Sequence, residues 1–388
     1  MIMPKPTSFS LVCPECGKIF DPETLQTFCS ACNSPILVKY DLHSIKSSLT
    51  PAIIAARPRG LWRWSELLPV LDPTYQLTLG EGDTPLLEVN RLGHSAGLNH
   101  LYLKDESLNA TGSFKARGLA VAVSKALELG VKHFVIPTAG NAGGALAAYA
   151  ARAGVPAAVF MPQETPLANQ REVEMSGASM HLVAGSISDA GKAAAAFARE
   201  SGAFDMSTFK EPYRVEGKKT LGFELAETFG LQLPDVIVYP TGGGTGLVGM
   251  WKAFQELEVL GWIDSCRPRM VVIQAAGCAP IVRAFEQNST RSTPWENPVT
   301  QASGLRVPNP FADRLILRTL RDSQGIAVSV SEEKIWAAQN EVAAQEGVFC
   351  APEGSATWAG SRILAQSGWI HSDEKVVLFN TGSGLKNI

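Results

Sequence analysis

The chain has 388 residues, of which 45% are hydrophobic and 18% are charged, and its formal net charge is −3. This length predicts two or three domains with a large buried core. The charge balance argues against a nucleic-acid-binding protein, because phosphate recognition rests on a surplus of lysine and arginine. Residues 1–10 contain no apolar segment of a secretory signal, and no uncharged apolar run reaches the roughly 18 residues of a membrane span. We therefore expect a soluble cytoplasmic protein without a nucleic-acid or membrane partner.

Four of the seven cysteines form two Cys-x-x-Cys pairs near the N-terminus. The pairs are Cys13 with Cys16 and Cys29 with Cys32. Structural Zn²⁺ is bound in a tetrahedron by four such ligands, with no open position. Reduced cysteine turns without metal are the alternative. The spacing favours a zinc-ribbon-like module over residues 8–40, with these cysteines as ligands of structural Zn²⁺.

Residues 41–79 contain four prolines and the sequence Leu-Trp-Arg-Trp, with Trp62 and Trp64. Tryptophans stabilise a fold by burial, so we expect an ordered connector rather than a flexible linker. The glycine-rich residues 80–83 precede Thr84 and Pro85 and predict a rigid bend before a strand.

The next segment places a lysine at the start of a helix. Residues 101–103 read as a strand, residues 109–112 as a turn, and residues 117–129 carry apolar side chains at helical spacing. Lys115 then lies in the first helical turn, where the free N–H groups and the helix dipole disfavour a cation. A surface lysine is the ordinary interpretation. The position is also that of an amine nucleophile with a lowered pKa.

Short apolar strands alternate with helices in the rest of the chain, which predicts βαβ units and parallel sheets. The expected strands are 133–137, 156–161, 180–183, a short one near Phe204, 235–239, 270–274, 326–330 and 376–379. The expected helices are 145–153, 188–201, 221–229, 247–260 and 332–346. Ligands bind at the carboxyl ends of such strands. Asn141, in the loop at 138–144, has an amide that both donates and accepts hydrogen bonds.

A glycine run lies between the strand 235–239 and the helix 247–260. Its backbone N–H groups and the helix N-terminus favour a phosphate. The run lacks the Gly-Lys-Ser/Thr of a nucleotide P-loop and does not match G-x-G-x-x-G. The last strand ends in small, hydroxyl-bearing residues. A lysine, an asparagine, a phosphate site and a hydroxyl together suit a phosphorylated aldehyde, pyridoxal 5′-phosphate, bound to the lysine as a Schiff base.

Four motifs resemble those of the fold-type II pyridoxal-phosphate enzymes, and those of threonine synthases in particular. They are Thr-Gly-Ser-Phe-Lys-Ala-Arg-Gly at 111–118, Ala-Gly-Asn at 139–141, Gly-Gly-Gly-Thr-Gly at 242–246 and Thr-Gly-Ser-Gly-Leu-Lys at 381–386. The resemblance covers residues 80–388. It implies an α/β catalytic region of two open twisted subdomains, roughly 95–205 and 206–388, with the cofactor in the cleft. An N-terminal zinc-ribbon-like segment also occurs in many sequences of that group.

The resemblance assigns a role to each matching residue. Lys115 would carry the cofactor and move protons, and Asn141 would bond the phenolic oxygen. Thr381 would face the pyridine nitrogen, with Ser383 as a second candidate. The cofactor phosphate would bind Gly242, Gly243, Gly244, Thr245 and Gly246. Thr84 and Thr138 would contact the substrate carboxylate or leaving group.

The implied reaction converts O-phospho-L-homoserine and water into L-threonine and phosphate, in a lyase that we expect to be a homodimer acting on a small amino acid. Ala116 stands where many members have aspartate, and the glycine run also resembles that of serine/threonine dehydratases. A dehydratase, a cysteate-synthase-like enzyme acting on phosphoserine and a non-catalytic cofactor-binding scaffold are the alternatives. The cations available for a substrate phosphate are Lys104, Arg117, Arg171, Lys218 and Lys219.

Overall fold

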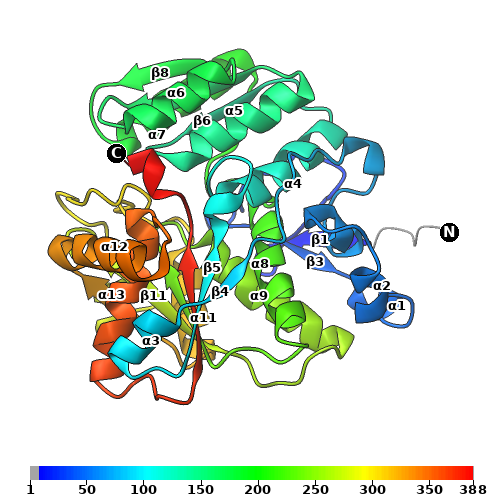
Figure 1. The fold of residues 1–388 in the computed structure, drawn as a ribbon. Helices are drawn as coiled ribbons and strands as arrows, with labels where there is room; N and C mark the ends of the chain where they lie inside the picture. The colour runs from blue at the N-terminus through cyan, green and yellow to red at the C-terminus, as the bar shows by residue number, and fades with distance from the viewer. Residues whose placement is uncertain (1–7, 388) are drawn as a thin grey trace. The chain divides into compact units, whose positions relative to one another are not determined.

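The structure is a computed structural model that describes residues 8–387 (Figure 1). The chain folds into two compact units. The first comprises the chain up to Asp83, Lys115–Phe223 and Gln255–Trp262, and the second comprises Thr84–Phe114, Glu224–Phe254 and the chain from Ile263 onward. Both units are discontinuous in sequence, and the expected boundaries at residues 40, 79 and 205 stay predictions.

A small antiparallel sheet opens the first unit, in the order β2-β1-β3. Its strands are β1 (Phe9–Val12), β2 (Ile19–Phe20) and β3 (Leu37–Tyr40). The connector that follows consists of short helices, namely α1 (Leu42–Ile45), α2 (Pro51–Ala55), η1 (Leu61–Leu67) and η2 (Pro73–Tyr75). Trp64 is buried, and its ring centroid lies 5.0 Å from that of Phe223. The connector is therefore ordered, as its tryptophans predict.

The larger sheet of the first unit has four parallel strands in the order β8-β7-β6-β9. They are β6 (Phe134–Pro137), β7 (Ala157–Pro162), β8 (Ser179–Val183) and β9 (Phe204–Asp205). Its helices are α4 (Lys115–Glu128), α5 (Asn141–Ala153), α6 (Leu167–Met175) and α7 (Ile187–Ser201). One core cluster is formed by alanines of α7, such as Ala190 and Ala194, packed with Val135 and Phe160. The predicted alternation of strands and helices is confirmed here.

The second unit is built on a six-stranded sheet in the order β12-β11-β10-β13-β5-β4. The strands are β4 (Leu86–Glu88), β5 (His100–Asp105), β10 (Val236–Pro240), β11 (Arg269–Ala275), β12 (Ile326–Val330) and β13 (Lys375–Asn380). All pairs are parallel except β4 with β5. The helices are α3 (Asn90–Ala96), η3 (Glu106–Leu108), α10 (Pro280–Glu286), α11 (Asp313–Asp322), α12 (Glu332–Glu346), α13 (Pro352–Gln366) and η4 (Gly384–Asn387). The central strands are buried, as expected of parallel strands covered by helices.

Helices α8 (Arg214–Thr228) and α9 (Thr245–Leu260) are each divided between the two units. The sequence predicts a start of α8 at residue 221, which is wrong, because the helix begins at Arg214. Its first turns bury charged side chains, including Glu216 and Lys219, and therefore show no apolar periodicity. Among residues 8–387, no helix is long and apolar enough to cross a membrane.

Candidate active site

Lys115 is the first residue of α4, as the sequence predicts. The helix behind it is almost entirely buried from Ala116 to Ala126. Such a helix is fixed by packing, so the backbone of Lys115 has a defined position at its N-terminus.

The residues before Lys115 pair with the C-terminal segment, and both segments belong to the second unit. Phe114 N donates to the carbonyl oxygen of Thr381 at 3.0 Å, and Ser383 N donates to that of Gly112 at 2.9 Å. Lys386 Nζ donates to the carbonyl oxygen of Thr111 at 2.9 Å. Two motifs that are distant in sequence are thus held side by side by main-chain bonds.

Asn141 is the first residue of α5 and follows the carboxyl end of β6. Its Oδ1 is buried and has no hydrogen-bond partner among the described residues. An unpaired buried amide costs free energy unless a ligand satisfies it, so this side chain is suited to a bound polar group. The hydroxyl of Thr138 instead bonds the backbone of Gly140, at 3.0 Å to its oxygen and 3.2 Å to its nitrogen.

The glycine loop at 242–244 joins β10 to the first turn of α9. Within the described chain, the N–H groups of Gly242, Gly243 and Gly244 donate no hydrogen bond. Thr245 begins α9, whose first N–H groups also lack helical acceptors. Consecutive free N–H groups at a helix N-terminus form an anion site, so this loop fits a phosphate group.

Close packing makes glycine necessary in this loop. A Cβ on Gly242 would lie 2.1 Å from the carbonyl oxygen of Gly304, and one on Gly244 would lie 2.4 Å from Ile316 Cδ1. A Cβ on Gly246 would lie 1.9 Å from the hydroxyl of Tyr239. Other segments of the same chain therefore pack closely against the loop.

Two buried side chains that support the glycine loop were missed in the sequence. Gln274 Nε2 donates to the carbonyl oxygen of Thr241 at 3.0 Å, while its Oε1 accepts from Ile281 N at 2.9 Å. Glu353 accepts from Gly304 N at 2.6 Å. Gln274 could have been found in the sequence as a polar residue at the end of an apolar strand. No local sequence pattern indicates the role of Glu353.

Thr381 follows directly after β13 and is buried. Ser383 Oγ accepts a hydrogen bond from Leu385 N at 3.3 Å, whereas no hydrogen bond engages the Thr381 hydroxyl within the described residues. Of the two candidate hydroxyls, that of Thr381 remains available to a ligand.

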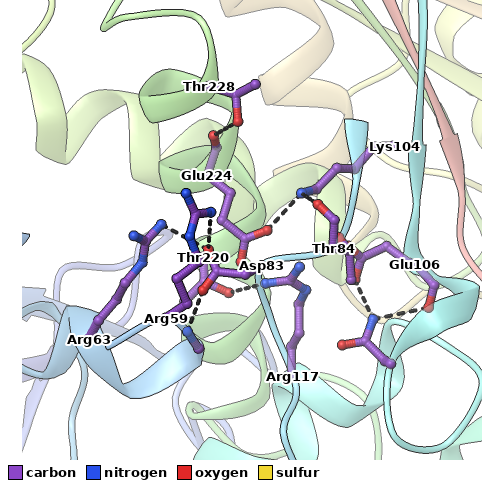
Figure 2. Close-up of polar contacts among 12 residues, drawn as sticks. Arg59, Arg63, Asp83, Thr84, Lys104, Glu106, Arg117, Thr220, Glu224 and Thr228 are labelled. Atoms are coloured by element: carbon purple, nitrogen blue, oxygen red, sulfur yellow. Dashed lines mark hydrogen bonds and ion pairs between the residues drawn. The ribbon is translucent and has the colours of Figure 1, made fainter. Parts of the chain in front are cut away.

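Thr84 belongs to a buried polar cluster in the second unit (Figure 2). Its hydroxyl donates to Glu106, and Asn109 Nδ2 donates to the same carboxylate at 2.9 Å. Lys104 Nζ donates to the carbonyl oxygen of Thr84 at 2.6 Å and pairs with Glu224 at 2.7 Å. Thr84 is therefore fixed in both its side chain and its backbone.

Three of the five cations proposed for a substrate phosphate are neutralised by carboxylates. Lys104 pairs with Glu224, Lys219 pairs with Glu216 at 2.8 Å, and the exposed Arg171 pairs with Glu174 at 2.8 Å. Arg117 and Lys218 are fully buried in the first unit, where Arg117 donates to Thr220 Oγ1 at 3.0 Å. Both are 0% exposed, as is Lys219, so burial alone does not distinguish the candidates.

The four N-terminal cysteines come together in one cluster, with their sulfur atoms within 4.8 Å of one another. The Sγ atoms of Cys13 and Cys32 are 3.3 Å apart, and those of Cys16 and Cys29 are 3.6 Å apart. Tetrahedral Zn²⁺ with bonds of about 2.3 Å separates its sulfurs by about 3.8 Å. Each Cys-x-x-Cys pair is followed by a residue with a left-handed backbone. These residues are Gly17, with φ of 73°, and Asn33, with φ of 51°. The geometry is compatible with zinc.

Comparisons with known proteins agree with this geometry. The family model described as pyridoxal-phosphate dependent enzyme matches residues 77–382. The chain belongs to the pyridoxal-phosphate dependent enzymes. It is 37% identical to a threonine synthase of Methanosarcina acetivorans over 98% of this chain and 92% of that one. It is 36% identical to a threonine synthase of Methanocaldococcus jannaschii over 97% and 92%.

Solved structures share the fold. A threonine deaminase from tomato, Solanum lycopersicum, matches with a TM-score of 0.66 and 22% identity, covering 80% of this chain and 86% of that chain. Maize serine racemase matches with a TM-score of 0.67 and 23% identity, covering 78% and 88%. The prediction of a fold-type II α/β enzyme is confirmed. The chain is a pyridoxal-phosphate-dependent lyase of the threonine synthase family, and the buried amide of Asn141 and the free N–H groups of the glycine loop fit its cofactor.

Proposed function

We propose that this enzyme converts O-phospho-L-homoserine and water into L-threonine and phosphate. The support for this substrate is the similarity to two threonine synthases over nearly the whole chain. The pairing of the lysine flank at 111–114 with the C-terminal motif at 381–386, which most resembles threonine synthases, agrees with it.

Pyridoxal phosphate, when bound, supplies an electron sink that stabilises negative charge at the substrate carbon next to the amino group. The N–H groups of the glycine loop at 242–244, with Thr245 and Gly246, bind its phosphate. Asn141 orients the ring through its phenolic oxygen. Thr381 offers the pyridine nitrogen a neutral hydroxyl, which does not force protonation of the ring.

Lys115 is the residue that moves protons. Its amine would hold the cofactor, and it would take one proton from Cα of the substrate and then one from Cβ. With phosphate lost from Cγ and water added at Cβ, the same amine would return one proton to Cγ and one to Cα. Proton transfer by one amine at these carbons requires an amine pKa near the working pH, which the position at the N-terminus of α4 favours.

The experiment that tests the substrate compares phosphate release and ketoacid release from phosphohomoserine, phosphoserine and threonine. We expect phosphate and threonine from phosphohomoserine alone. The proposal is wrong if phosphohomoserine yields neither phosphate nor threonine. Phosphate release from phosphoserine, or ketoacid release from threonine, would then identify the substrate.

One observation favours a dehydratase-like reaction as the second candidate. A substrate phosphate needs cations, and Lys104, Arg171 and Lys219 are already paired with carboxylates. Substitution of Arg117 by Met separates the two reactions. It raises KM for phosphohomoserine if Arg117 binds the leaving group, and it leaves KM for an unphosphorylated amino acid unchanged.

We further propose that Cys13, Cys16, Cys29 and Cys32 bind one structural Zn²⁺ and that the enzyme is a homodimer. The support for zinc is the sulfur cluster, and that for the dimer is the general prevalence of twofold assemblies. Metal analysis of the purified protein and light scattering test the two proposals.

A further inference from the structure

The C-terminal half of α4 is held by the connector. Ser124 Oγ accepts a hydrogen bond from Leu77 N at 3.0 Å. Glu128 Oε1 accepts from Leu71 N at 2.8 Å and from Asp72 N at 2.6 Å. Backbone donors from residues 71–77 are thus satisfied by side chains of the helix that begins at Lys115, and all these residues belong to the first unit.

The N-terminal module contacts the same helix. Lys125 Nζ lies 5.3 Å from the ring centroid of Phe9 on β1 and pairs with Glu128 at 2.6 Å. The ring of Phe9 in turn lies 5.8 Å from that of Tyr40, the last residue of β3. The small sheet therefore contacts α4 through Phe9.

Tyr40 also anchors a fully buried charge network. Its hydroxyl donates to Glu216 at 2.9 Å. Lys219 pairs with Glu216 and with Glu256, each at 2.8 Å, and donates to the carbonyl oxygen of Leu67 at 2.6 Å. Glu216 and Lys219 are 0% exposed, so each charge depends on these partners. The network joins β3 and the connector to α8.

The first turn of α8 touches the first turn of α4 backbone to backbone. A Cβ on Gly217, the residue after Glu216, would lie 2.0 Å from the carbonyl oxygen of Arg117. A Cβ on Gly118 would lie 2.8 Å from the carbonyl oxygen of Arg214. Because the two backbones are in direct contact at these glycines, a shift of α8 is transmitted to the turn that contains Lys115.

We propose that residues 8–79 act as a brace for α4, and that Tyr40 and Glu216 are positioning residues for the amine of Lys115. The brace holds α4 at its C-terminal half through Ser124, Lys125 and Glu128, and at its first turn through Tyr40, Glu216 and Gly217. The inference rests on the proposed function only in taking Lys115 as the cofactor lysine. It gives the N-terminal module an intramolecular partner, the lysine helix.

The first experiment compares Tyr40→Phe with Tyr75→Phe in the full chain. The first change removes only the hydroxyl bonded to Glu216, and the second removes the hydroxyl of an exposed tyrosine of the connector that has no hydrogen-bond partner among the described residues. We expect Tyr40→Phe to raise the dissociation constant of pyridoxal phosphate for the apoenzyme about tenfold. We also expect it to shift the pH midpoint of the absorbance of the lysine-bound cofactor, and Tyr75→Phe to change neither.

A second variant, Ser124→Ala, loosens the other end of the brace and should act in the same direction. Hydrogen–deuterium exchange of residues 115–125 in the apoenzyme provides a reading that does not involve the cofactor, and the brace predicts faster exchange in both variants than in the Tyr75→Phe control. If both variants only lower Tm, with exchange and cofactor affinity equal to the control, the brace is wrong. If exchange rises but Lys115 carries no cofactor in the wild type, the brace stands and the proposed function fails.

Discussion

The N–H group of Phe114 donates a hydrogen bond to the carbonyl oxygen of Thr381, with 3.0 Å between nitrogen and oxygen. Lys115, proposed to carry the cofactor, is the residue after Phe114. Thr381, the partner of Phe114, is the residue proposed to face the cofactor ring. The bond fixes the backbone on which both side chains depend. It also links two motifs that the sequence identifies separately.

Lys115→Ala should abolish the yellow absorbance of lysine-bound pyridoxal phosphate and lower kcat on the order of 10²–10⁴-fold, because the only proposed proton carrier is lost. Borohydride reduction followed by peptide mass spectrometry should find the cofactor on Lys115 in the wild type. Lys132→Ala, at an exposed lysine, serves as the control. Persistence of a covalently bound cofactor in the Lys115 variant would disprove the assignment.

Gly244→Ala should weaken binding of pyridoxal phosphate by tenfold or more and lower stability, because its new methyl group would meet Ile316 at 2.4 Å in the loop proposed to bind the phosphate. Gly230→Ala is the matched control, since both glycines have left-handed backbones (φ of 79° and 65°) but a Cβ on Gly230 meets nothing within 4 Å. The backbone strain of about 1–2 kcal/mol is common to both. Equal cofactor affinities in a fluorescence titration would show that the loop does not bind the cofactor.

Cys29→Ser should reduce the zinc content from one to about zero equivalents per chain and lower Tm, because a structural site requires all four ligands. Cys266→Ser, at an exposed cysteine outside the cluster, should change neither. Metal analysis and calorimetry of the two variants make the comparison. A wild-type protein that contains no metal and is stable to chelators would contradict the zinc proposal.

Glu211→Gln should flatten the pH dependence of stability. Burial raises the pKa of Glu211 from 4.5 to about 7, although the guanidinium of Arg214 and hydrogen bonds from the N–H groups of Tyr213 and Arg214 oppose the shift. Between these values the folded state binds the proton more tightly than the unfolded state, so this carboxyl's stabilising contribution is complete below pH 4.5 and is lost as the pH rises to about 7.

The measurement for Glu211 is the free energy of unfolding in urea at several pH values across this window. Glu174→Gln, at an exposed carboxylate, should retain the wild-type slope. A wild type whose stability rises through the window, with the Glu211 variant following it, would show that the carboxyl is ionised in the folded state.

The strands and helices that form the two sheets were predictable because their side chains follow simple periodicities. The strand at 326–330 and the helix at 332–346 have the bounds that the sequence predicts. The positions of Lys115, Asn141 and the glycine loop were also predictable, since each lies at the end of a strand or the start of a helix, while their roles toward the cofactor stay predictions.

The buried polar partners were not predictable. The sequence offers Lys104 as a phosphate ligand, but in the structure it pairs with Glu224, 120 residues away. The first turns of α8 are polar in sequence and buried in the structure, because Glu216 and Lys219 neutralise each other. Such pairs depend on contacts between distant segments, and no local pattern indicates which charges meet.

The bond from Lys386 Nζ to the carbonyl oxygen of Thr111 joins residues 275 positions apart. During translation, residues 111–114 are therefore synthesised long before their partners at 381–386. Closing so long a segment costs little more entropy than closing one of half the length, because the cost grows only with the logarithm of length. A nascent chain that ends before residue 381 therefore lacks the main-chain acceptor of Phe114, the residue before Lys115.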